Sequence, residues 1–157
     1  MRKLVLVSVL IVAVSALASP KKTSKAPTHK IFTPSEIQWG DAPPSIPKGA
    51  KLAVLEGDPS KAGFFVIRIK APDGFRIAPH WHPTRENLTI ISGTFNLGMG
   101  DTLDQSKTTA MTTGSFGYLD AKMHHYATCS GETVVEVSGN GPFVINYVNP
   151  KDDPSKK

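Results

Sequence analysis

The feature that most constrains the fold is a series of short apolar runs, separated by glycine and proline turns, between residues 51 and 148. In the run over residues 63–70, Phe65, Ile67 and Ile69 lie on one face and Arg68 and Lys70 on the other, as in a strand with one buried face. Further runs cover residues 51–56, 88–91, 95–99, 116–119, 126–128, 133–137 and 143–148. Short strands at this regular spacing predict an all-β sandwich or barrel.

The length of the chain, 157 residues, suits one folded domain. With 39% hydrophobic and 20% charged residues, the composition is that of a globular protein rather than a disordered one. Cys129 is the only cysteine in the chain, so no internal disulfide can form. We therefore expect packing alone to hold the domain together.

The first residues have the layout of a secretory signal peptide. Met1-Arg2-Lys3 is basic, residues 4–17 are almost wholly apolar, and Ala16-Leu17-Ala18 has the small residues of a cleavage site. The apolar run is short for a membrane span, which needs about 20 residues, although an uncleaved anchor is the alternative. We predict a signal peptide over residues 1–18, export to the periplasm or the medium, and no stable membrane insertion of the mature form.

The remaining boundaries follow from composition. We expect a flexible or extended arm over residues 19–48, the barrel domain over 49–149, and a disordered tail over 150–157. The chain has a net charge of +5 and a pI near 9.4. Much of the surplus lies in lysines of these tails, without interleaved aromatic residues, so we expect no nucleic-acid partner.

A group of histidines predicts a metal site. His80 and His82 are two residues apart, and side chains at this spacing on a strand point to the same face. Glu86 follows after a three-residue turn, and His125 comes from a separate run. Three imidazoles and one carboxylate suit one divalent transition metal, Fe, Mn, Zn, Ni, Co or Cu. Four protein ligands leave one or two coordination positions open for a reaction.

Three neighbouring residues leave alternatives open. His124 competes with His125 as the ligand, and alternation sends the other histidine outward. The same alternation directs Cys129 inward, where it either packs or lies near the metal. Arg85, inside the ligand turn, either steers an anionic substrate or is solvated.

The spacing around the first three ligands resembles the first motif of the cupin family. Every defining position of that motif is matched, in the order Gly74, five residues, His80-Trp81-His82, three residues, Glu86, six residues and Gly93. The segment over residues 49–63 also resembles small single-domain cupins and the cupin domains of some zinc-binding anti-sigma factors.

The second motif is matched less completely. Gly114, ten residues and His125 fit it, but the proline, glycine and distal asparagine of the motif are replaced by Asp120, Lys122 and Cys129. The resemblance covers roughly residues 50–148. It implies a jelly-roll barrel with the metal held by His80, His82, Glu86 and His125 in its mouth, and a homodimer paired through edge strands.

These features lead us to expect a metal-dependent cupin of the cell envelope, an oxidoreductase of the dioxygenase type that takes a small-molecule substrate. Glu86 has the catalytic role in this reading, because it can leave the metal or take up a proton during turnover. One alternative is a protein that binds a metal or small ligand without catalysis. Another is a metal-dependent isomerase, lyase or decarboxylase.

Overall fold

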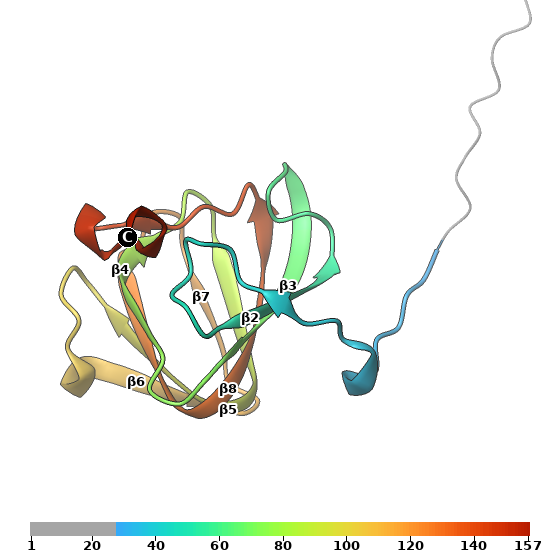
Figure 1. Cartoon of the computed structure of the whole chain (residues 1–157), viewed down its shortest axis with the longest axis horizontal. Coiled ribbons are helices and arrows are strands. Elements are labelled where there is room, and N and C mark those ends of the chain that lie inside the picture. The colour runs from blue at the N-terminus through green and yellow to red at the C-terminus, as the bar shows by residue number, and fades with distance from the viewer. Residues whose placement is uncertain (1–27) are drawn as a thin grey trace, which may run out of the picture. The chain divides into compact units, whose positions relative to one another are not determined.

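Antiparallel strands form one curled sheet in this computed structural model, which describes residues 28–157 (Figure 1). The predicted signal peptide and residues 19–27 lie outside the described residues. The folded unit is Phe32–Lys157. Its strands are β1 (Gly40–Asp41), β2 (Lys51–Glu56), β3 (Gly63–Ala71), β4 (Arg76–Trp81), β5 (Glu86–Met99), β6 (Thr108–Thr112), β7 (Phe116–Leu119), β8 (His125–Gly141) and β9 (Asn146–Tyr147).

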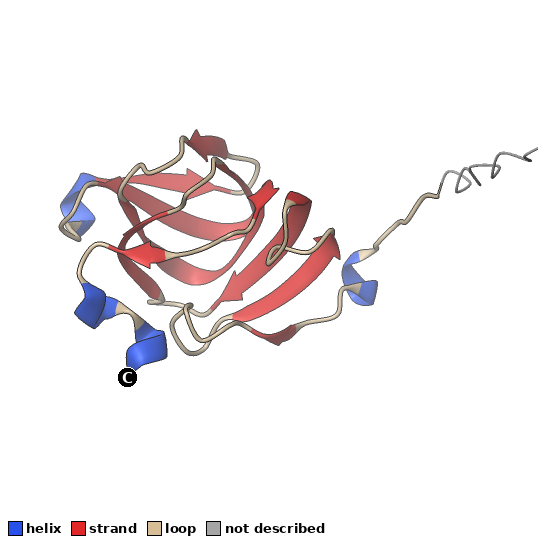
Figure 2. Cartoon of the chain, turned by 90° about the horizontal axis from the view of Figure 1, so that it is seen from above, coloured by secondary structure: helices blue, strands red, loops and turns tan. Residues whose placement is uncertain are grey.

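The strands pair in the order β1-β2-β3-β8-β4-β9, and β5 pairs with β6, β7 and β8. Every pairing is antiparallel, and the sheet curls around its own interior (Figure 2). The short 3-10 helices lie between or beyond the strands, at η1 (Pro34–Glu36), η2 (Gln105–Lys107), η3 (Pro150–Asp152) and η4 (Pro154–Lys156). The all-β prediction is therefore confirmed. Within the described residues, no helix is long and apolar enough to cross a membrane.

The two longest strands, β5 and β8, form a ribbon that bends at its middle. Register shifts between residues 90 and 94 mark bulges, which bend and twist a strand. Gly93 lies at this bend with φ +77°, and a Cβ atom there would overlap the carbonyl oxygen of Glu132. Glu86 and His125 lie at opposite ends of the ribbon, yet the bend brings Glu86 Oε2 within 3.3 Å of His125 Nε2. The candidate site thus depends on the curl.

The core lies inside the curl. Phe65, Ile67 and Ile69 on β3 are buried, as the alternating pattern predicted. On β8, Val137 lies opposite Ile67 and Val135 opposite Ile69, so that alternate residues of both strands face the interior. Complete burial of a side chain of this size contributes about 1.5–3 kcal/mol. Burial of these side chains therefore stabilises a domain that has no internal disulfide.

Several sequence-based boundaries differ from the structure. The runs at 88–91 and 95–99 form the single strand β5, and those at 126–128 and 133–137 form β8, because bulges rather than turns separate them. Strand β6 was not predicted, since its Thr-rich sequence has little alternation. Met99 is exposed at the end of β5, whereas Phe95 on the same strand is buried.

The segments that flank the barrel contain short helix caps and a few buried apolar side chains. In residues 150–157, where a disordered tail was expected, the side chains of Asn149 and Asp153 cap η3 and η4 by accepting backbone N–H bonds. Within the expected arm, Ile37 and Ile46 are buried, and the Tyr147 hydroxyl donates to the Ser45 carbonyl at 2.7 Å.

Candidate metal centre

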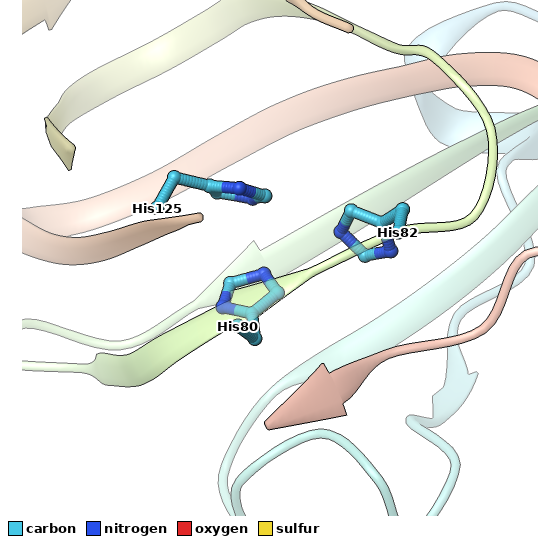
Figure 3. A group of neighbouring side chains, drawn as sticks. All are labelled: His80, His82 and His125. Carbon is cyan, nitrogen blue, oxygen red and sulfur yellow. The ribbon is translucent and has the colours of Figure 1, made fainter. Parts of the chain in front are cut away.

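Three histidines meet inside the barrel (Figure 3). His80 lies on β4, His82 directly follows that strand, and His125 begins β8, where it pairs with His80. One ligand atom from each lies within 4.8 Å of the other two. The ring centroids of His80 and His125 are 4.2 Å apart, and His82 lies 5.1 Å from His80 and 5.3 Å from His125.

Glu86, the fourth predicted ligand, lies against the same group. Its Oε2 atom is 3.3 Å from His125 Nε2 and 3.7 Å from His82 Nε2. All four residues are buried, with exposed fractions of 4% for His80, 3% for His82, 6% for Glu86 and 3% for His125. The structure therefore brings together all four residues that the spacing predicted.

Backbone carbonyls fix the orientation of each ring. The Nδ1 atoms of His80, His82 and His125 lie 2.8, 2.8 and 2.9 Å from the carbonyl oxygens of Ala78, Val144 and Met123 respectively. A carbonyl oxygen can only accept, so each Nδ1 carries the proton and donates. In a neutral imidazole with this tautomer, the Nε2 atom has a free lone pair. Histidines that bind metals commonly donate their other ring N–H to a backbone carbonyl in this way.

Burial favours the neutral form of His80 and His82, which is the form that binds a metal. Burial, with the nearby His125 and His82, lowers the pKa of His80 well below its ordinary value of 6.5. Burial also lowers the pKa of His82, although the Glu86 carboxylate opposes that shift. A neutral imidazole competes for a cation without first releasing a proton.

Two buried atoms in this group have no partner within the folded protein. They are His82 Nε2 and Glu86 Oε2, a lone pair and a carboxylate oxygen. Such unsatisfied atoms are rare inside proteins, because each costs free energy. A divalent cation satisfies both, and a donor set of three imidazoles and one carboxylate suits Fe, Mn, Zn, Ni, Co or Cu. The residues present therefore fit a transition metal.

The turn before His125 contains two of the departures from the second motif, Asp120 and Lys122. Lys122 stands where the motif has glycine and takes φ +66°, a left-handed conformation that glycine favours. Its N–H donates to the His82 carbonyl at 2.8 Å, which ties the turn to the first ligand pair. Asp120 accepts two hydrogen bonds from Arg85, at 2.9 and 2.6 Å. Arg85 is thus exposed and paired at the surface.

The structure also resolves the choice between neighbouring histidines. His124 is 38% exposed on its side chain, and its Nδ1 lies 2.6 Å from Asp101 Oδ1, so it points away from the group that contains His125. Cys129 is buried but is not among the clustered donors. Burial raises the pKa of its thiol, which favours the protonated form.

Phe143 is a site residue that sequence reasoning missed. Its ring stacks on that of His82, with centroids 4.2 Å apart and planes 15° apart, and also contacts Phe65 at 5.1 Å. The next residue, Val144, supplies the carbonyl that orients His82. The run over 143–148 indicated only a strand, and a contact 61 residues away in sequence leaves no local signal.

Solved structures with the same fold include several cupins. The polyketide cyclase RemF of Streptomyces resistomycificus is 14% identical, with a TM-score of 0.67 over 82% of this chain and 92% of that one. An acetylacetone dioxygenase of Acinetobacter johnsonii is 14% identical, with a TM-score of 0.60 over 87% of each chain. An RmlC-like cupin of Shewanella frigidimarina is 13% identical, with a TM-score of 0.55 over 72% and 91%.

These similarities confirm the cupin-type jelly-roll barrel. The expected likeness to anti-sigma cupin domains is found as well, since ChrR of Rhodobacter sphaeroides, in complex with SigE, matches over 68% of this chain and 51% of ChrR (TM-score 0.51, 14% identity). No curated protein matches the chain. The family described as a domain of unknown function, DUF4437, matches residues 29–146. The chain therefore belongs to the DUF4437 family, and its fold is that of the cupins.

Proposed function

We propose that this protein is a metal-dependent cupin oxidoreductase of the dioxygenase type, which acts on a small organic substrate. The observation that carries the proposal is the group of four buried donors, two of them with unsatisfied atoms, at the inner surface of an apolar barrel. The similar structures support it, because they include an acetylacetone dioxygenase and a polyketide cyclase. The predicted signal peptide supports a place in the cell envelope.

The charge of the site limits the substrate. A divalent metal with three neutral histidines and the Glu86 carboxylate would leave one net positive charge. Within the described part of the chain, the hydrogen bonds and ion pairs of the four candidate ligands involve no lysine or arginine. Because a second negative charge would be buried without a partner, we expect a neutral molecule or a monoanion, such as an enolate or a monocarboxylate.

Each residue has a distinct task in this proposal. His80, His82 and His125 hold the metal, with their ring planes fixed by backbone carbonyls. Glu86 is a ligand through Oε2 and is the only carboxylate in the group, so it is the residue placed to take a proton from a substrate C–H or O–H bond. A redox-active metal would supply the reactivity toward O₂ that no side chain provides.

The test is oxygen uptake by the purified protein after removal of metal and reloading with Fe²⁺, Mn²⁺, Ni²⁺, Co²⁺, Cu²⁺ or Zn²⁺. Substrates are small diketones, phenols and monocarboxylic acids. The proposal expects uptake with a redox metal, loss of uptake in Glu86→Gln, and full uptake in Glu136→Gln, since Glu136 pairs with Arg68 away from the site. Turnover without O₂ would instead indicate an isomerase, lyase or decarboxylase. Tight Zn²⁺ binding without any turnover would indicate a binding protein.

A further inference from the structure

A small cavity lies inside the barrel, against His80, Glu86 and His125. The space open to the centre of a water-sized sphere is about 30 Å³. On such a measure, one water needs about 10–15 Å³, and a cavity of about 150 Å³ holds benzene. The cavity is therefore larger than a single water requires and far too small for an aromatic ring.

Apolar side chains form the wall beyond the metal ligands. Phe75, Ile77, Leu88 and Phe95 line it, together with smaller residues from β3 and β8. All four side chains are also buried in the core cluster. An apolar wall of this kind offers a water molecule nothing to bond to, and apolar cavities stay dry.

Only two polar side chains line the cavity apart from the candidate ligands, within the described part of the chain. Thr133 Oγ1 is already used, since it donates toward the Thr94 and Gly131 carbonyls and accepts the Thr94 N–H at 3.2 Å. Cys129 has a thiol, which is a weak donor and acceptor. A water away from the metal would lack the two to four partners that it needs.

We infer that this cavity binds one small, uncharged, apolar molecule beside the metal, and that dioxygen is its ligand. The identity of the ligand rests on the proposed function, since dioxygen is the apolar co-substrate of a dioxygenase. The existence of an apolar binding site rests on the cavity alone. A site of this kind would hold dioxygen next to the open coordination positions and leave the organic substrate to enter from elsewhere.

Two alanines allow the cavity to be filled without touching a ligand. Ala71 on β3 and Ala127 on β8 line it and are buried. Ala53 on β2 is equally buried but is not among the lining residues, so Ala53→Val is a matched control. Valine is favoured in strands, and each of the three changes adds the same two methyl groups.

The probe is xenon, which occupies dry apolar cavities, measured by ¹²⁹Xe NMR and in xenon-pressurised crystals of the full chain. We expect one xenon in the cavity of the Zn²⁺-loaded wild type, loss of binding in Ala71→Val and in Ala127→Val, and retention in Ala53→Val. Circular dichroism checks that each variant folds. No xenon in the wild type, or xenon retained in both folded filling variants, would overturn the cavity as a ligand site.

Oxygen kinetics test the identity of the ligand. In iron-loaded protein, the KM for O₂ should rise at least severalfold in Ala127→Val and stay unchanged in Ala53→Val. An unchanged KM in a variant that has lost xenon would overturn dioxygen as the ligand. If xenon binds but no substrate consumes O₂, the proposed function fails, and dioxygen with it, while the apolar site stands.

Discussion

Replacing Glu86 by methionine separates what the site contributes to metal binding from what it costs in stability. The Glu86 side chain is buried, and its Oε2 atom has no hydrogen-bond partner. A buried polar group without a partner costs about 1–3 kcal/mol, and more when it is charged. Methionine is unbranched and apolar, so it removes this penalty and fills a similar space. We expect the metal-free E86M protein to be about 1–3 kcal/mol more stable than the metal-free wild type.

The metal should reverse that order. A cation that binds only the folded state, present at 1,000 times its Kd, stabilises by about 4 kcal/mol, or roughly 12 °C in Tm for a chain of this size. The wild type has the carboxylate ligand and should show this gain. The E86M variant lacks it and should show a much smaller one. Zinc is the appropriate cation, because it has no redox chemistry.

The assay is urea unfolding followed by circular dichroism at pH 8, with EDTA and then with Zn²⁺. The control is Glu136→Met, which removes a partly exposed ion pair with Arg68 (2.9 Å) on the outside of the barrel. This control should lose at most about 1 kcal/mol and keep the zinc-dependent gain. A metal-free E86M protein that is less stable than the wild type by more than about 1 kcal/mol would refute the reasoning, because the carboxylate would then have partners in the fold itself.

Three further predictions concern the same site. Burial lowers the pKa of His80 and His82 below 6.5, so just below pH 6.5 the unfolded chain binds more protons than the folded one. The metal-free protein should therefore lose stability as the pH falls below 6.5. Urea unfolding between pH 8 and 5 measures this, and a flat profile would contradict it. Phe143→Leu removes the ring stacked on His82, and such a stack contributes about 0.5–1.5 kcal/mol. Zinc affinity, measured by competition with a chelator, should therefore fall about two- to tenfold. An unchanged affinity would show that Phe143 does not position His82. Lys122→Gly relieves a left-handed residue and should raise the metal-loaded Tm by a few degrees, about 1 kcal/mol; a lower Tm would show that the Lys122 side chain stabilises the turn.

The four candidate ligands could be predicted because their signal is local. The positions of His80, His82 and Glu86 depend on one strand end and one turn, and spacing in the sequence describes both. His125 was placed by its distance from Gly114, and the structure brings it, rather than His124, into the group. Alternation along the strand gives the physical reason, since neighbouring side chains point to opposite faces, and His124 Nδ1 lies 2.6 Å from Asp101 Oδ1 on the exposed side.

The parts that the sequence did not predict depend on contacts between distant segments. The stack of Phe143 on His82 and the carbonyl of Val144 come from a segment that follows β8, and no local pattern marks either. The apolar runs on either side of Gly93 form the single strand β5. The sequence separated them because a glycine in a bulge and a glycine in a turn give similar signals. Hydrophobic periodicity reports which faces of the strands are buried, and it carries no information on which metal or substrate binds.

The departures from the second cupin motif show how a turn tolerates substitution. The backbone at Lys122 keeps the conformation that glycine takes easily, and its N–H binds the His82 carbonyl. At the proline position, Asp120 forms an ion pair with Arg85 instead. Position-by-position matching counts both as mismatches, although the turn still ends with His125 inside the barrel.

The central claim is that His80, His82, Glu86 and His125 hold one transition metal. The most direct measurement is elemental analysis, by mass spectrometry, of the protein purified without chelator and then dialysed against a mixture of the six divalent metals. The claim predicts one metal per chain in the wild type, close to none in His80→Ala and His125→Ala, and one per chain in His124→Ala. A wild type without metal, or a folded His125→Ala variant that keeps a full equivalent, would contradict it.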